Sequence, residues 1–105
     1  MNETDRMYGA IGFAQKAGKC VSGSFAVEKA VKSGKARLVL LDESASENAK
    51  EKYQSLCKQA GIACLQVEDI GRAIGKDERI SAAIVDAGFA TRIANLHGSI
   101  VGWQK

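Results

Sequence analysis

The sequence contains no proline, so its turns must be made by other residues, chiefly its 11 glycines and its serines. Aromatic residues make up only 6% of the chain. No apolar run approaches the roughly 20 residues that a membrane-spanning helix needs. Residues 1–6 are polar and acidic, unlike a secretory signal. We therefore expect neither a membrane protein nor a secreted one.

Residues suited to metal binding and catalysis are also scarce. His97 is the only histidine, and no serine or cysteine adjoins it in the sequence for it to activate. The three cysteines, Cys20, Cys57 and Cys64, form no C-x-x-C pair. We expect no metal and no cofactor, and we interpret the cysteines as reduced core thiols of a cytoplasmic protein.

Two further patterns bear on catalysis, and neither supports it. Gly18 and Gly23 have the spacing of the first two P-loop glycines, but Ser24 stands where the phosphate-binding lysine belongs. Pairs of acidic residues occur at 42–43, 68–69 and 77–78, all at the boundaries of expected elements, where acids serve as caps and turns. We therefore predict that the protein is not an enzyme.

What remains is the composition of a folded domain. The chain has 105 residues, of which 46% are hydrophobic, so we expect one domain over 1–105 with 98–105 as a tail.

Ser44 and Glu47 have the spacing of a capping box, which marks the start of a helix. Helical spacing predicts helices over residues 4–17, 45–60 and 70–74, and a last helix capped by Asp86.

Apolar runs of strand length lie between these helices, at residues 36–41, 62–67 and 80–85. Because they are continuous rather than alternating, they predict strands buried on both faces. Cys20 and Val21 add a short edge strand. Alternation of strands and helices is typical of an α/β domain that carries helices on both faces of a small sheet.

The net charge of +3 permits an anionic partner without requiring one. Basic residues concentrate between positions 14 and 37, where Glu28 is the only acid. Within this segment a turn of small residues at 22–24 leads into a helix that Gly34 ends. Phe25, Lys29 and Lys32 fall at i, i+4 and i+7, on one face of that helix.

Two interpretations of this face stay open. The free N–H groups at a helix start attract phosphate, lysines add charge, and an aromatic ring can stack on a base. Alternatively, the lysines form a solvated surface, and Phe25 is a hydrophobic staple or a core anchor at the helix start.

The chain resembles the kink-turn-binding ribosomal protein superfamily, which includes the archaeal L-seven-Ae and eukaryotic L-thirty-e proteins, and it is most similar to the bacterial YlxQ type. The resemblance extends over about residues 8–93 and implies a three-layer α-β-α sandwich with a four-stranded mixed sheet. The segments that carry it are residues 12–19, 22–23, 29–41, 42–48 and 70–76.

The resemblance implies that two neighbouring loops bind RNA. The first usually reads Gly-Thr-Asn-Glu, with a lysine three residues later, and its Asn and Glu read the sheared G·A pairs of the kink. Here Gly23 and Lys29 match, and Ser24 replaces threonine. Phe25 and Ala26 replace Asn and Glu, and neither side chain can hydrogen-bond a base edge.

The second loop of that family usually packs an apolar–Glu–apolar rim on a flipped-out nucleotide. Here Lys76, Asp77 and Glu78 occupy the rim, so the central acid is kept and both apolar positions are charged. These departures favour phosphate contacts with altered base readout.

We therefore predict a non-catalytic protein that binds structured RNA, ribosomal or regulatory. The alternative is a protein-interaction module that kept the fold, lost RNA recognition and contacts a protein partner through Trp103 and the C-terminal tail. The predicted RNA-binding residues are Lys19, Gly23, Ser24, Phe25, Lys29, Lys32, Lys35, Arg72, Lys76 and Arg79.

Overall fold

The computed structural model describes residues 2–101 of the chain. Among these residues no helix is both long and apolar enough to cross a membrane. The elements in chain order are α1 (Glu3–Lys16), β1 (Cys20–Ser22), α2 (Ser24–Lys32), β2 (Leu38–Asp42), α3 (Glu47–Ala60), β3 (Ala63–Val67), α4 (Ile70–Ile74), β4 (Ser81–Ile84) and α5 (Ala87–Val101).

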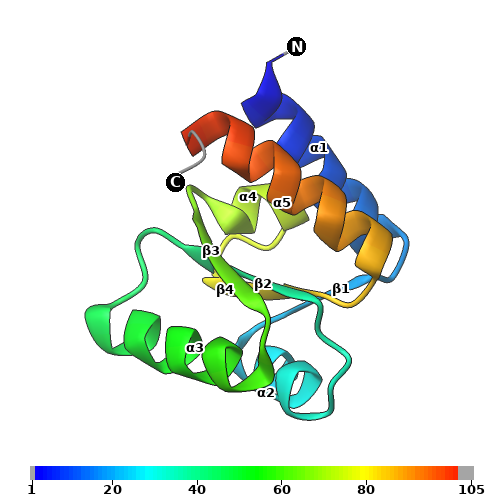
Figure 1. Cartoon of the computed structure of the whole chain (residues 1–105). Helices are drawn as coiled ribbons and strands as arrows, with labels where there is room; N and C mark the ends of the chain where they lie inside the picture. The colour runs from blue at the N-terminus through cyan, green and yellow to red at the C-terminus, as the bar shows by residue number, and fades with distance from the viewer. Residues whose placement is uncertain (1, 102–105) are drawn as a thin grey trace.

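The strands form one mixed sheet of four strands in the order β1-β4-β2-β3. β2 and β3 are parallel, whereas β4 runs antiparallel to both of its neighbours, β1 and β2. Helices α1, α4 and α5 cover one face of the sheet, and α2 and α3 cover the other (Figure 1). This arrangement confirms the predicted three-layer α-β-α sandwich.

Strand β2 lies inside the sheet and contacts a core on each face, so its residues 38–41 all have to be apolar. Leu38 and Leu40 point into the core beneath α1, α4 and α5, whereas Val39 and Leu41 point into the core above α2 and α3. Successive side chains of a strand face opposite ways, so a strand between two cores must be apolar at every position. β4 is buried throughout in the same way.

The prediction that residues 62–67 form a strand buried on both faces is wrong. They form β3, which lies at the edge of the sheet, with Ala63 and Gln66 exposed and Cys64 and Leu65 only half-buried. Residues of high apolar content are common on edge strands too, so continuity alone did not reveal the position of the strand in the sheet.

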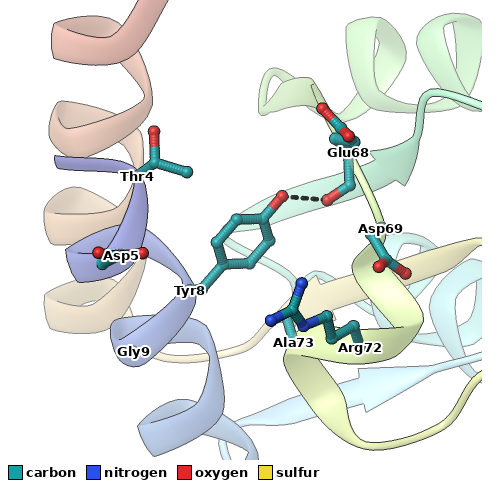
Figure 2. A pocket seen from close by; sticks show the side chains of 8 residues that line it. All are labelled: Thr4, Asp5, Tyr8, Gly9, Glu68, Asp69, Arg72 and Ala73. Carbon is teal, nitrogen blue, oxygen red and sulfur yellow. Dashed lines mark hydrogen bonds between the residues drawn. The ribbon is translucent and has the colours of Figure 1, made fainter. Parts of the chain in front are cut away.

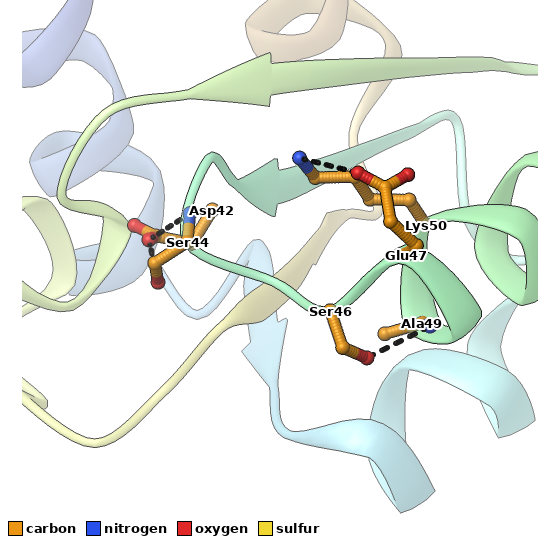
Figure 3. Close-up of polar contacts among 6 residues, drawn as sticks. All are labelled: Asp42, Ser44, Ser46, Glu47, Ala49 and Lys50. Atoms are coloured by element: carbon orange, nitrogen blue, oxygen red, sulfur yellow. Dashed lines mark hydrogen bonds and ion pairs between the residues drawn. The ribbon is translucent and has the colours of Figure 1, made fainter.

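The predicted capping box of Ser44 and Glu47 is also wrong. Ser46 is the N-cap of α3, and its hydroxyl accepts a hydrogen bond from the Ala49 amide at 3.1 Å (Figure 3). Ser44 belongs to the preceding turn, where its amide and its hydroxyl both donate to the Asp42 carboxylate. Because Asp42 binds Ser44, the cap of α3 is the serine two residues later.

The last helix is longer than expected. Asp86 caps it as predicted, since its carboxylate accepts from the Phe89 amide at 2.9 Å. The helix continues through residues 98–101, which were expected to form part of a tail, and Gly98 is buried within it. Trp103 lies outside the described residues.

Candidate nucleic-acid interface

The turn at residues 22–24 connects β1 to α2. Gly23 has φ of +90°, a left-handed conformation that favours glycine, and its amide donates to the Ser81 carbonyl at 3.1 Å. Within the described part of the chain, no side chain caps the start of α2. The first amides of the helix, beginning at Ser24, are therefore available to an acceptor from outside.

A second loop, residues 75–80, lies against this turn. The Arg79 guanidinium donates through Nε to the Ser22 hydroxyl at 3.2 Å. The same side chain lies 3.7 to 3.9 Å from the position that a β-carbon on Gly23 would occupy. Glu78 also contacts Arg79, with 3.5 Å between Oε1 and Nη1. Arg79 therefore joins two loops that are far apart in the sequence.

Helix α4 fixes where this second loop runs. A β-carbon at Gly71 would lie 2.6 Å from the Lys76 carbonyl oxygen and 2.7 Å from the Asp77 carbonyl oxygen. The Lys76 amide in turn donates to the Gly71 carbonyl at 2.8 Å. The loop therefore packs directly on the backbone of α4, and only glycine at position 71 permits it.

Asp42 binds the first residue of α4. Its carboxylate is buried and accepts from the Ile70 amide at 2.7 Å as well as from Ser44. Burial alone would raise the pKa of this carboxyl, but the hydrogen bonds from Ser44 and the Ile70 amide leave the pKa below its ordinary value. Asp42 thus remains an ionised acceptor that ties the end of β2 to the start of α4.

The outer face of α2 carries the residues that the helical spacing grouped. Phe25 is 81% exposed, so the interpretation of this ring as a staple or a core anchor is wrong. Lys29 and Lys32 are exposed as well. Together with Ser24 and Glu28 these side chains line an open hollow of about 370 Å³.

Glu28 is the acid in this hollow, and it pairs with α3. Lys52 Nζ lies 2.7 Å from Glu28 Oε2, an exposed ion pair of modest energetic value. The hydrogen bond from Lys52 lowers the pKa of Glu28, and Lys52 itself has a raised pKa through the same bond. The pair fixes the direction of Glu28, and among residues 2–101 neither Lys29 nor Lys32 forms an ion pair of its own.

The structure does not bring all the predicted residues together. Gly23 and Ser24 lie at the end of the sheet where β4 begins, next to Arg79. Lys19 and Lys35 lie toward the opposite end, because the Lys19 carbonyl accepts from Val85, just after β4 ends, and Lys35 follows the last turn of α2. Helix α2, which has nine residues and is therefore about 14 Å long, separates Gly23 from Lys35.

Arg72 lies in a different setting, in a hollow of about 500 Å³ between α1 and α4 (Figure 2). Asp5, Glu68 and Asp69 also line this hollow, so carboxylates outnumber the single guanidinium. The Tyr8 hydroxyl donates to the Glu68 carbonyl. Burial, followed by the charges of Glu68 and Asp69, raises the pKa of Tyr8. An acidic hollow of this kind repels phosphate.

Sequence reasoning missed the buried residues whose hydrogen bonds hold the two loops in place. Ser81 is fully buried, its carbonyl binds the Gly23 amide, and its hydroxyl lies 3.1 Å from the Tyr53 hydroxyl. A serine inside an apolar strand was the only signal, since a buried hydroxyl requires a hydrogen-bond partner. Asp42, at the end of the strand β2, gave a comparable signal.

Comparison with known proteins shows the family to which this chain belongs. Residues 5–94 match the Ribosomal protein L7Ae/L30e/S12e/Gadd45 family. The chain belongs to this family. The RNA-binding protein YlxQ of Bacillus subtilis (strain 168) is 38% identical to it over 89 residues, which cover 82% of this chain and 89% of that protein. The RNA-binding protein YlxQ of Enterococcus faecium is 32% identical and covers 91% of this chain and 97% of its own length.

Solved structures agree with the fold. A protein of unknown function from Bacillus halodurans C has a TM-score of 0.83 at 34% identity, over 87% of this chain and 95% of that one. A 15.5kD RNA binding protein from Giardia lamblia has a TM-score of 0.74 at 19% identity, over 96% of this chain and 90% of that one, a likeness of fold alone.

These findings confirm the predicted family and its YlxQ type. The YlxQ relatives are named for RNA binding, a non-catalytic activity, in agreement with the prediction that this family member is not an enzyme.

Proposed function

We propose that this protein binds structured RNA without catalysing a reaction, through the turn at residues 22–24, the outer face of α2 and the second loop, residues 75–80. The observation that carries the proposal is the contact between Arg79 and Ser22, which joins the two loops into one surface. The names of the YlxQ relatives support RNA as the ligand.

Phosphate contacts supply the affinity in this proposal. Arg79 lies beside the open start of α2, where free amides and the positive end of the helix dipole also favour an anion. Lys29 and Lys32 add two exposed cations in the last turn of the same helix. Glu78 already pairs with Arg79, so RNA phosphate competes with that carboxylate. Binding therefore includes the exchange of an exposed ion pair for a phosphate contact.

Base readout differs from that expected of a kink-turn binder. Phe25 and Ala26 cannot accept or donate hydrogen bonds through their side chains. Phe25 offers an exposed ring on which an unpaired base can stack, as in readers of single-stranded RNA. The preferred target is thus a structured RNA, ribosomal or regulatory, that contains an unpaired nucleotide.

A cytoplasmic location fits the cysteine chemistry of the protein. Cys20, Cys57 and Cys64 all carry free thiols. Burial raises the pKa of Cys20 to about 11, and burial together with the nearby Cys64 thiol raises that of Cys57 to about 12. Such thiols are weak nucleophiles at neutral pH, as in a reduced structural role.

Fluorescence anisotropy tests the proposal. The protein is titrated, at one fixed salt concentration, into a kink-turn stem-loop, a straight duplex and a single strand of equal length. The kink-turn RNA, which contains unpaired nucleotides beside a duplex, is expected to bind most tightly. Equal binding to all three RNAs would leave a general phosphate-binding surface without the proposed preference for structure.

Absence of binding to every RNA at tens of micromolar would contradict the proposal. That result would favour a protein-interaction module instead. Capture of a protein partner that survives nuclease treatment and is lost when residues 102–105, which lie beyond α5, are deleted would establish the alternative.

A further inference from the structure

The hollow on the outer face of α2 is bounded by side chains of opposite character. The helix spacing places Phe25 and Lys32 along the middle of the exposed face, one near each end of the helix. Glu28 and Lys29 lie to either side of this line, and all four line the same hollow. An aromatic ring, a carboxylate and two ammonium groups thus surround one open space.

The carboxylate in this hollow has one oxygen to spare. Glu28 Oε2 binds Lys52 at 2.7 Å, whereas Oε1 has no partner among residues 2–101. The bond from Lys52 lowers the pKa of Glu28, so the group stays ionised and accepts hydrogen bonds at neutral pH. Phosphate offers no donor to the free oxygen of Glu28, so this carboxylate adds nothing to a surface that binds phosphate alone.

We propose that this hollow binds one unpaired nucleobase that carries an amino group, with guanine preferred: Phe25 stacks on the base, Glu28 accepts from its N–H groups, and Lys29 and Lys32 bind the adjoining phosphates. This inference rests on the proposed RNA-binding function and names the feature of the RNA that the site selects.

The donor pattern of the bases explains the preference. Guanine presents N1–H and N2–H₂ side by side, and Glu28 can accept from both if the free Oε1 takes one hydrogen bond and Oε2 takes the other with the lone pair that Lys52 does not use. Adenine and cytosine each present one amino group. Uracil has a single imino N–H, and it lies between two carbonyl oxygens. A carboxylate that approaches this N–H is repelled by both oxygens. The expected order of affinity is therefore guanine first, adenine and cytosine next, and uracil last.

The inference is tested with four stem-loop RNAs that differ only in one unpaired nucleotide, G, A, C or U. Anisotropy titrations with the wild-type protein are expected to give about three- to tenfold tighter binding to the G than to the U RNA, the range of one or two net hydrogen bonds. Glu28→Gln should reduce this ratio to below twofold, while affinity for the U RNA stays the same or rises.

Glu51→Gln is the matched control, since it removes an equal charge from an exposed position on α3. It should leave the ratio unchanged. A second measurement acts on the RNA alone: inosine in place of guanine lacks the N2 amino group and should bind the wild-type protein more weakly than guanine does. This readout does not depend on how the variant folds.

The outcomes separate the inference from the function on which it rests. Salt-sensitive binding to all four RNAs with equal affinity, or a G-to-U ratio that survives Glu28→Gln, would overturn the base-selecting hollow and leave RNA binding intact. No binding to any of the four RNAs would overturn both.

Discussion

The outer face of α2 and the hollow between α1 and α4 are both open, and each contains one aromatic side chain, but they differ in charge. The α2 face sets Lys29 and Lys32 against Glu28, whose carboxylate is already paired. The α1–α4 hollow sets Arg72 against three carboxylates. A phosphate chain is attracted to the first and repelled from the second, although both contain basic residues that the sequence pattern selected.

The aromatic rings differ in the same sense. Phe25 is 81% exposed and has no polar atom to be bound elsewhere. The Tyr8 hydroxyl is bound to the Glu68 carbonyl, which holds the ring against the loop between β3 and α4. The exposed Phe25 ring can receive a base, whereas the Tyr8 ring packs against the core beside α1 and α4.

The largest expected effect is a loss of stability when the packing of the second loop on α4 is disturbed. It is measured by comparing alanine substitutions at Gly71 and Gly9. Gly71→Ala would place a β-carbon 2.6 Å from a backbone oxygen. We expect a loss of about 2 to 3 kcal/mol in the free energy of unfolding, because the backbone must shift to admit the methyl group. Thermal unfolding followed by circular dichroism measures the change.

Gly9→Ala is the control for this prediction. Gly9 lies in the α1–α4 hollow, and a β-carbon there would meet no atom within 4 Å. In a helix interior alanine is favoured over glycine, so this variant should be more stable by about 0.5 to 1 kcal/mol. Equal melting temperatures for the two variants would show that the second loop does not depend on close packing against α4.

The next effect concerns the exposed ring. Phe25→Ala should weaken binding to an RNA with an unpaired nucleotide about tenfold, and binding to a straight duplex less than threefold, because a lost base stack costs about 1 to 3 kcal/mol. Phe13→Ala, which removes another ring that is 64% exposed, is the control and should leave RNA binding unchanged. A lower melting temperature with unchanged affinity for Phe25→Ala would indicate a structural role.

A smaller and more uniform effect is expected of the lysines. Lys29→Ala should weaken binding to every RNA by about three- to fivefold and make the log–log salt slope less steep by about one, as the loss of one phosphate contact requires. Lys58→Ala removes an exposed lysine from α3 and serves as the comparison. If both variants lose the same affinity, the charge of the protein as a whole, rather than the α2 face, attracts RNA.

The smallest effect is expected at Arg72, and it tests the contrast between the two regions directly. Because Asp5, Glu68 and Asp69 line the same hollow as Arg72 and oppose phosphate there, Arg72→Ala should change RNA affinity less than twofold. Anisotropy titrations of this variant beside Lys29→Ala give the comparison. A loss at Arg72 as large as that at Lys29 would extend the RNA interface into the acidic hollow.

The arrangement of layers was predictable because local patterns agree with the fold. The apolar runs that became β2 and β4 require two covered faces, and the glycines at 34, 61 and 75 adopt the positive φ that ends a helix. The position of β3 at the edge was not predictable, since it depends on which strands pair with it. Pairing between distant segments leaves no periodic signal within either one.

The candidate site was predictable only where it follows one helix. Phe25, Lys29 and Lys32 share a face because of helical spacing, and the structure keeps them together. The contact of Arg79 with Ser22 joins residues from separate elements, and the burial of Asp42 depends on α4. Arg72 was grouped with the other cations by sequence position, although three carboxylates line the hollow in which it lies.

The central claim is that phosphate contacts of the α2 face and the adjoining loops hold RNA, and a salt series tests it most directly. The dissociation constant of the wild-type protein for one kink-turn stem-loop is measured by anisotropy at several salt concentrations. Three to six phosphate contacts predict a log–log slope of roughly −2 to −5. A slope near zero would contradict phosphate-led binding.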